Sequence, residues 1–182
     1  IELVKGVSKN GRETAKHFYG ANGFVSHHNL DLWINTTPVG FNVPHSSRYA
    51  FWNMSSGWLC RHLFEHYEYT LDKDFLREVA YPIMKESARF YLDMMVMHNG
   101  KWILTPSTSP ENIYITPDGY YGRTAYGTAS DHAIIRECLS NAVSAASLMG
   151  DSSFAEKAED VLSRLGGYKV GANGALQEWH HD

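Results

Sequence analysis

Apolar side chains recur at intervals close to 3.6 residues in four stretches of the chain, and this spacing predicts four amphipathic helices. Residues 1–18 also carry a helical pattern, typical of the end of a helix. Pro82 is expected to begin the longer part of the second helix, because proline is tolerated in a first turn. Ser130 is expected to cap the third helix and Gly150 to end it. The four predicted helices are 47–70, 72–96, 130–150 and 152–165.

Two long segments between the predicted helices, 17–46 and 98–129, lack a helical pattern. Loops longer than about 12–15 residues in compact domains are usually functional or disordered, and the many Trp, Tyr, His and Asn side chains here argue against disorder. We therefore expect these loops to line one end of a helical scaffold. Short strands are predicted at 101–105 and 175–179. The expected fold class is all-α, with wide apolar helix faces typical of layered helices such as a helical toroid.

Composition narrows the class of protein. The 182 residues are 43% hydrophobic and 20% charged, which is typical of a folded domain. The formal net charge is −4 and no Lys/Arg-rich run occurs, so we expect no nucleic-acid partner. No stretch of about 18 apolar residues predicts a membrane span. Two cysteines cannot make a disulfide framework, and Cys60 and Cys138 are interpreted as buried thiols in helices.

Aromatic and imidazole groups are frequent, with 5 Trp, 11 Tyr, 8 Phe and 10 His. They suit a site that stacks on and hydrogen-bonds neutral polar ligands such as sugars; a large aromatic core is the alternative. The loop 26–33 gathers His28, Asn29 and Asp31, which we interpret as sugar ligands. A polar network that only holds the loop in shape is the alternative. Metal binding is disfavoured, because His27 and His28 are adjacent and no third soft ligand follows at a suitable spacing.

A second candidate is the segment 105–112, in which Pro106 and Pro110 stiffen the backbone around one carboxylate, Glu111. A rigid mount among Tyr and Trp side chains is what a general acid needs, because apolar surroundings favour the protonated carboxyl group. The alternative is a surface glutamate in a proline-rich turn. Glu111 is therefore the predicted proton donor of a catalytic site.

Three further features are weaker. Trp52 lies near the first long loop and is interpreted as a stacking platform for a ligand, whereas Trp58 is assigned to the core. Asp131 lies in the first turn of a predicted helix, where the helix dipole favours a carboxylate, so a role in helix initiation is preferred over a place in the site. The polar residues 176–182 resemble the beginning of a site loop.

Four motifs stand out, in the segments 19–33, 57–67, 108–112 and 176–179. Together they resemble the motifs of family 95 glycoside hydrolases, most of which are α-L-fucosidases. Each motif alone is a weak signal, but the similarity extends over the whole chain in order. The usual small-residue run before the Trp-Leu pair is replaced here by residues 53–57, a mild departure.

The resemblance implies part of an (α/α)6 toroid and an inverting exo-hydrolase that releases terminal L-fucose, typically α-1,2-linked, from an oligosaccharide or glycan. Glu111 matches the general acid of the family. His28, Asn29, Asp31 and Trp52 fall where the family contacts the sugar. No cofactor and no metal are implied. The substrate itself is the expected partner, with no nucleic acid and no membrane.

Residues 1–182 are expected to be one partial catalytic domain, an internal fragment of a larger glycosidase that is inactive when isolated. The resemblance places the base and the groups that hold the attacking water outside this segment. Three alternatives stay open: an α-L-galactosidase, another glycosidase or phosphorylase on the same toroid, and a non-catalytic carbohydrate-binding protein. The sequence leaves linkage and oligomeric state undecided, and leaves an extracellular or periplasmic location open.

Overall fold

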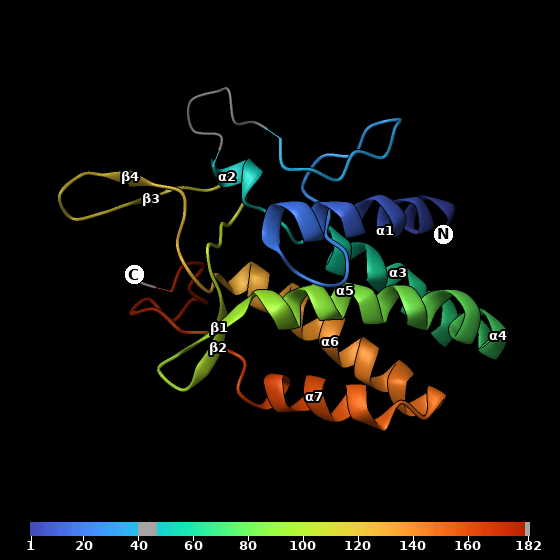
Figure 1. Cartoon of the computed structure of the whole chain (residues 1–182). Coiled ribbons are helices and arrows are strands. Elements are labelled where there is room, and N and C mark those ends of the chain that lie inside the picture. The colour runs from blue at the N-terminus through green and yellow to red at the C-terminus, as the bar shows by residue number, and fades with distance from the viewer. Residues whose placement is uncertain (40–46, 181–182) are drawn as a thin grey trace.

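The computed structural model describes residues 1–39 and 47–180, and most of the regular structure in them is helical (Figure 1). Two helices contain a π-helical turn, labelled η1 and η2. The helices are α1 (Glu2–Thr14), η1 (Ala15–Tyr19), α2 (Ser47–Ala50), α3 (Ser55–Thr70), α4 (Lys73–Phe75), η2 (Leu76–Ala80), α5 (Tyr81–Met94), α6 (Ala129–Met149) and α7 (Ser152–Ser163). The strands are β1 (Met95–His98), β2 (Lys101–Leu104), β3 (Tyr114–Ile115) and β4 (Tyr121–Gly122). No helix in this part of the chain is both long and apolar enough to cross a membrane.

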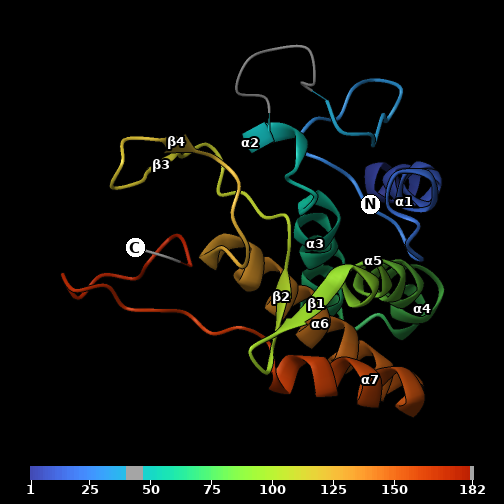
Figure 2. The same ribbon diagram turned by 60° about the vertical axis from the view of Figure 1, so that its left-hand side comes forward.

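Helices α5 and α6 lie at the centre of the packing. Helix α5 contacts α1, α3, α6 and α7, and α6 also packs against α3 and α7 (Figure 2). Leu63 of α3, Met84 and Phe90 of α5 and Leu139 of α6 are fully buried in the core. Burying one such side chain contributes about 1.5–3 kcal/mol. The amphipathic stripes read from the sequence therefore meet in one hydrophobic core, to which the buried Cys60 and Cys138 also belong.

The predicted single helix over 47–70 is wrong, because the chain leaves the helical conformation between α2 and α3. The hydroxyl group of the buried Tyr91 lies at this break. It accepts from the backbone N–H of Gly57 at 3.0 Å and lies 3.4 and 3.3 Å from the carbonyl oxygens of Asn53 and Met54. The hydroxyl group of a side chain from α5 therefore hydrogen-bonds to backbone groups that a continuous helix would pair with one another.

Other predicted boundaries also change. Ser130 does not cap α6; the cap is Thr128, whose Oγ1 accepts from the backbone N–H of Asp131. Gly150 ends α6 in the left-handed conformation, as predicted. Pro82 lies in the first turn of α5, directly after the wider turn η2, which avoids the clash between a proline ring and the preceding helical turn.

The strands form two small antiparallel hairpins. The strand predicted at 101–105 is confirmed as β2, which pairs with β1. Strand β3 pairs with β4 in the second hairpin. The strand predicted at 175–179 is wrong, since only an isolated bridge joins Val170 to Leu176 there. The described residues therefore support an all-α class, with hairpins as extensions of the helical layers.

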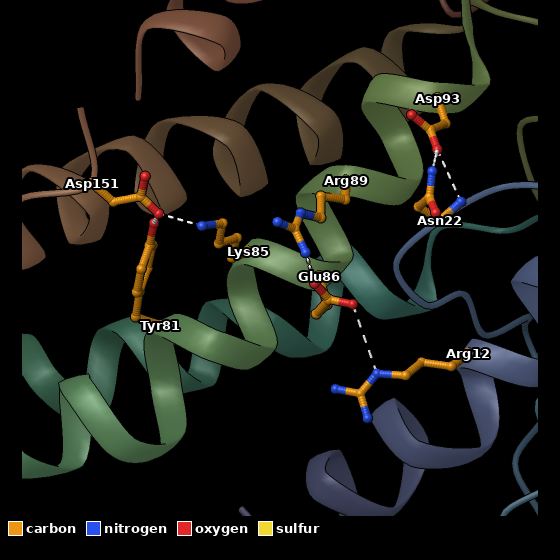
Figure 3. A network of polar contacts seen from close by, with 8 residues as sticks. All are labelled: Arg12, Asn22, Tyr81, Lys85, Glu86, Arg89, Asp93 and Asp151. Carbon is orange, nitrogen blue, oxygen red and sulfur yellow. Dashed lines mark hydrogen bonds and ion pairs between the residues drawn. The ribbon is translucent and has the colours of Figure 1, made fainter. Parts of the chain in front are cut away.

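Polar clamps join α5 to its neighbours (Figure 3). Asp151, the N-cap of α7, forms an ion pair with Lys85 and accepts a hydrogen bond from Tyr81 Oη at 2.6 Å. These two contacts, Lys85 first, lower the pKa of Asp151 to about 2. The carboxylate therefore stays charged and joins the beginning of α7 to α5.

The opposite side of α5 is linked to the first loop and to α1 (Figure 3). Asp93 Oδ2 accepts from both the backbone N–H and the side-chain amide of Asn22, at 2.9 and 2.8 Å. Glu86 contacts Arg89 on its own helix and Arg12 of α1, the latter at 3.7 Å. Ion pairs near the protein surface contribute about 0–1 kcal/mol, so the Glu86 contacts add little to the stability of the fold.

Long connections leave the helices at one end of the layers. The C-terminal ends of α1 and α5 and the N-terminal ends of α3 and α6 lie at the end that carries the loops and both hairpins (Figure 1). This arrangement agrees with the prediction that loops line one end of a helical scaffold. The described parts of the two long loops therefore come close together in space.

Candidate functional site

The loop that carries Glu111 is held by Ser107. The backbone N–H and carbonyl of Ser107 pair with Ala125 at 2.9 and 2.8 Å. Its Oγ accepts from the backbone N–H of Thr128 at 3.2 Å and donates to Asp131 Oδ2 at 2.6 Å. All of these groups except Ala125 are fully buried. The loop is therefore attached to the N-terminal turn of α6 before it reaches Glu111.

Asp131 has a second role beyond helix initiation. Its carboxyl group is 1% exposed and binds Ser107. Burial raises the pKa of Asp131 to about 7, and the hydrogen bonds from Ser107 and Thr128 oppose this rise. The sequence indicated the helix start but could not indicate that Asp131 holds the loop of the predicted acid.

Glu111 is exposed, and two residues of α2 hold it. Tyr49 Oη donates to Glu111 Oε2 at 3.0 Å, and Arg48 Nη1 donates to the Glu111 carbonyl oxygen at 3.3 Å. The guanidinium of Arg48 also lies over the Tyr49 ring, 4.8 Å from its centroid. A phenol and an arginine therefore lie directly beside Glu111, and whether apolar surroundings favour its protonated form stays a prediction.

The adjacent histidines of the first loop have different environments. His27 is fully buried; because a carbonyl only accepts, its Nδ1 donates to the Thr36 oxygen at 2.8 Å and its Nε2 accepts from Tyr19 Oη at 2.5 Å. Burial lowers the pKa of His27 to about 4, so the ring is neutral. Ser55 Oγ also donates to the His27 carbonyl at 2.6 Å. His27 thus anchors the loop to the beginning of α3.

His28 is half-buried and lies beside Tyr49, with ring centroids 5.3 Å apart. Burial lowers the pKa of His28, while the backbone of Tyr49 and the charge of Glu111 oppose that effect. The imidazole is therefore favoured in its neutral form, which can both donate and accept hydrogen bonds. Tyr49 therefore contacts both predicted site residues, His28 through its ring and Glu111 through its hydroxyl group.

Four of the five predicted site residues line one cavity of about 480 Å³, and these are His28, Asn29, Trp52 and Glu111. A smaller cavity of about 280 Å³ shares His28, Trp52 and Trp58 with it. Sequence reasoning missed Tyr49, which carries no motif signal and lies 62 positions from Glu111 along the chain. The complete lining of the larger cavity is His28, Asn29, Tyr49, Trp52, Trp58, Pro110, Glu111, Ser130 and Ile134.

Trp58 was assigned to the core from its helical spacing, and this assignment is wrong. Its side chain is 53% exposed and packs edge-to-face against Trp52, with ring centroids 6.0 Å apart. The buried face of α3 is formed instead by residues such as Cys60, Leu63 and Tyr67. The two indoles form one wall of the cavity. The signal in the sequence for this role of Trp58 was that both tryptophans lie near the first loop.

Asp31 lies outside the lining of this cavity among the described residues. It is exposed, and its Oδ1 accepts from the backbone N–H groups of Trp33 and Asn35 at 3.0 and 2.9 Å. These bonds hold a turn in the first loop. The expectation that Asp31 contacts a sugar stays a prediction.

The cavity combines one carboxylate, one imidazole, one carboxamide, a phenol and two indoles. Within residues 1–39 and 47–180, His, Cys, Asp and Glu side chains form no group of three or more that could hold a metal ion. Indoles offer flat apolar faces, and the polar groups offer hydrogen bonds at their edges. Placed at the loop-bearing end of the helical layers, this combination is typical of a carbohydrate-active domain.

Comparison with known proteins gives the family. The glycosyl hydrolase family 95 catalytic domain matches residues 1–182, and the chain belongs to this family. It is 33% identical over 185 residues to Alpha-L-fucosidase 2 of Arabidopsis thaliana, a match that covers 100% of the chain and 22% of that protein. It is 27% identical over 180 residues to Probable alpha-fucosidase A of Aspergillus niger, covering 94% of the chain and 21% of that protein. The chain thus spans about a fifth of the length of these relatives.

Proposed function

We propose that the chain carries the acid-bearing part of a glycosidase active site that releases terminal α-linked L-fucose from oligosaccharides or glycans. The observation that carries the proposal is Glu111 at the wall of a cavity that also holds His28 and Asn29. Membership of family 95 and the names of the two fucosidase relatives support the choice of reaction and sugar.

The proposed reaction is a single displacement with inversion. Glu111 gives its proton to the glycosidic oxygen while the bond from that oxygen to the anomeric carbon breaks and its electron pair stays on the oxygen. A water molecule attacks the anomeric carbon from the opposite face and loses a proton to a base. That base and the groups that hold the water are proposed to come from other parts of the full-length protein.

The roles of the surrounding side chains follow from their chemistry. Tyr49 donates to Oε2 of Glu111, which leaves Oε1 to carry the transferable proton and stabilises the carboxylate once the proton has left. Asn29 and the neutral His28 are proposed to bind sugar hydroxyl groups. Trp52 and Trp58 are proposed to pack against the apolar face and methyl group of fucose, where a water-exposed indole gains most from burial.

The (α/α)6 toroid is proposed as the architecture of the complete domain. Its support here is the layered packing of α3, α5, α6 and α7 and the collection of loops at one end of the layers (Figure 1). Loops at the same end of the remaining helices would then complete the cavity around the sugar.

The test is Glu111→Gln in the full-length enzyme. A glutamine keeps the shape and accepts the Tyr49 hydrogen bond, but it has no proton to give. We expect hydrolysis of a fucosylated oligosaccharide to fall by at least about 100-fold, within the range typical of general acid catalysis. A nitrophenyl fucoside, whose leaving group needs little protonation, should lose much less. If the variant cleaves the oligosaccharide within a few-fold of wild type, Glu111 is not the acid.

A further inference from the structure

A second cavity, of about 510 Å³, lies beside the loop 105–112 that carries Glu111, here called the acid loop. It shares no lining residue with the first cavity. Its volume falls in the range of about 300–1,000 Å³ typical of small-ligand sites. Three aromatic rings and two threonines dominate its walls. These residues are Tyr114, Tyr126, Trp179, Thr116 and Thr124.

The aromatic walls are held in place before any ligand binds. Tyr114 of β3 donates from its hydroxyl to the Thr124 carbonyl at 2.8 Å and packs edge-to-face against Trp179, with ring centroids 5.0 Å apart. Its paired residue in β4 is Gly122. A Cβ added at Gly122 would lie 2.0 Å from Tyr114 Cζ, so the glycine leaves room for the ring. The hairpin (Figure 1) is therefore shaped around this phenol.

A hydrogen bond joins the loop that carries Glu111 to the segment that carries Trp179. Glu111 lines the first cavity and Tyr114, three residues later, lines the second. Between them, Asn112 Nδ2 donates to Glu178 Oε1 at 2.6 Å, and Glu178 directly precedes Trp179. The Glu178 carbonyl in turn accepts from the backbone N–H of Ala129 at the beginning of α6, at 3.0 Å. The second cavity is thus fastened to both the acid loop and the helix that supports it.

We propose that this second cavity binds the part of the substrate from which fucose is cleaved, as a site for neutral sugar units beyond the scissile bond. This proposal rests on the proposed function. A general acid protonates the oxygen that joins the two sugars, so the departing saccharide extends along the side on which the acid stands. The cavity next to the acid loop offers flat rings for the apolar faces of pyranoses and the Thr124 side chain at their edges, while the Thr116 hydroxyl is held by Asp118 and the Tyr120 backbone.

The experiment compares Trp179→Ala with wild type in the full-length enzyme, using a nitrophenyl fucoside and a fucosylated tetrasaccharide. We expect kcat/KM for the tetrasaccharide to fall about tenfold or more and that for the nitrophenyl fucoside to change less than twofold. Trp179→Phe, which keeps an aromatic face, should recover part of the loss. Trp33→Ala is the matched control, since Trp33 is 81% exposed and lines neither cavity within the described residues.

A binding measurement separates this proposal from the proposed function. The fucose-free trisaccharide is titrated into wild type and into the Trp179→Phe and Trp179→Ala variants, which requires no hydrolysis. Binding that weakens about tenfold on loss of the indole supports the site, whatever sugar the enzyme releases. Equal losses on both substrates, or trisaccharide binding that is unchanged in Trp179→Ala, would overturn it. Wild type that binds the trisaccharide but releases no fucose would refute the proposed function alone.

Discussion

The phenol hydroxyl of Tyr49 donates to Glu111 Oε2 across 3.0 Å, and the two residues stand 62 positions apart in the chain. Tyr49 belongs to the four-residue helix α2, while Glu111 follows a loop anchored to α6. The contact joins two separately supported elements at the cavity wall. It also leaves a single carboxyl oxygen of Glu111 for proton transfer.

Tyr49→Phe tests the importance of that contact. The phenyl ring keeps its place beside His28 and Arg48 but cannot donate to Glu111. A hydrogen bond to a charged group contributes about 1.5–3 kcal/mol, and Glu111 is exposed, so we expect the lower end of this range, about a tenfold fall in kcat for an oligosaccharide. KM should change little, and a nitrophenyl fucoside should be affected less. A uniform loss with both leaving groups would instead indicate a general structural defect.

Asn29→Ala and Asp31→Ala should separate sugar binding from loop structure. Asn29 lines the cavity, so its alanine variant should raise KM several-fold without lowering the melting temperature. Asp31 accepts two backbone hydrogen bonds, so its alanine variant should lose about 1 kcal/mol of stability as well as substrate affinity. Steady-state kinetics and thermal melts of the full-length variants provide the measurement. An Asp31→Ala enzyme with lower stability but unchanged KM would restrict Asp31 to the turn.

His27 should make the fold sensitive to acid. Its pKa is about 4 in the folded chain and 6.5 without burial, so the unfolded state binds the extra proton as the pH falls below about 6.5. The stabilising contribution is present above pH 6.5 and is lost progressively down to pH 4. Relative to wild type, the stability deficit of His27→Gln should shrink by about 2 kcal/mol between pH 7 and pH 5. Urea unfolding at both pH values is the check; an equal deficit at both would contradict a buried neutral imidazole.

Asp131 should give the stability of the fold the opposite dependence on pH. Burial raises its pKa from 3.8 to about 7, so the folded state holds a proton that the unfolded state releases, and stability is lost as pH rises from about 4 to 7. Asp131→Asn cannot ionise but still accepts from Ser107, so it should gain about 2–3 kcal/mol on wild type between pH 5 and pH 8. Asp131→Ala, which releases Ser107, should lose more activity than the asparagine variant. Equal activity in both variants would mean that the Ser107 bond does not position the acid loop.

The sequence by itself determined the helical character of the chain and much of the candidate site. Periodic apolar positions placed the main helices because burial of a stripe requires the 3.6-residue repeat. Glu111 between stiffening prolines and the polar loop with His28 and Asn29 were recognisable because such groups in a loop have no packing role to explain them. The four motifs then pointed to family 95, which the comparisons confirm.

Contacts between distant segments decided where one helix is broken and which side chains meet at the candidate site. The Tyr91 hydroxyl ends a helix that the periodicity continued, and Trp58 faces the cavity because α3 buries a neighbouring stripe. Tyr49 reaches Glu111, and Asp131 holds Ser107, only once the loops meet at the end of the helical layers. Local propensity depends on neighbours a few residues away, whereas hydrogen bonds of this kind form between groups that packing alone brings together. Their partners could therefore be named only from the tertiary structure.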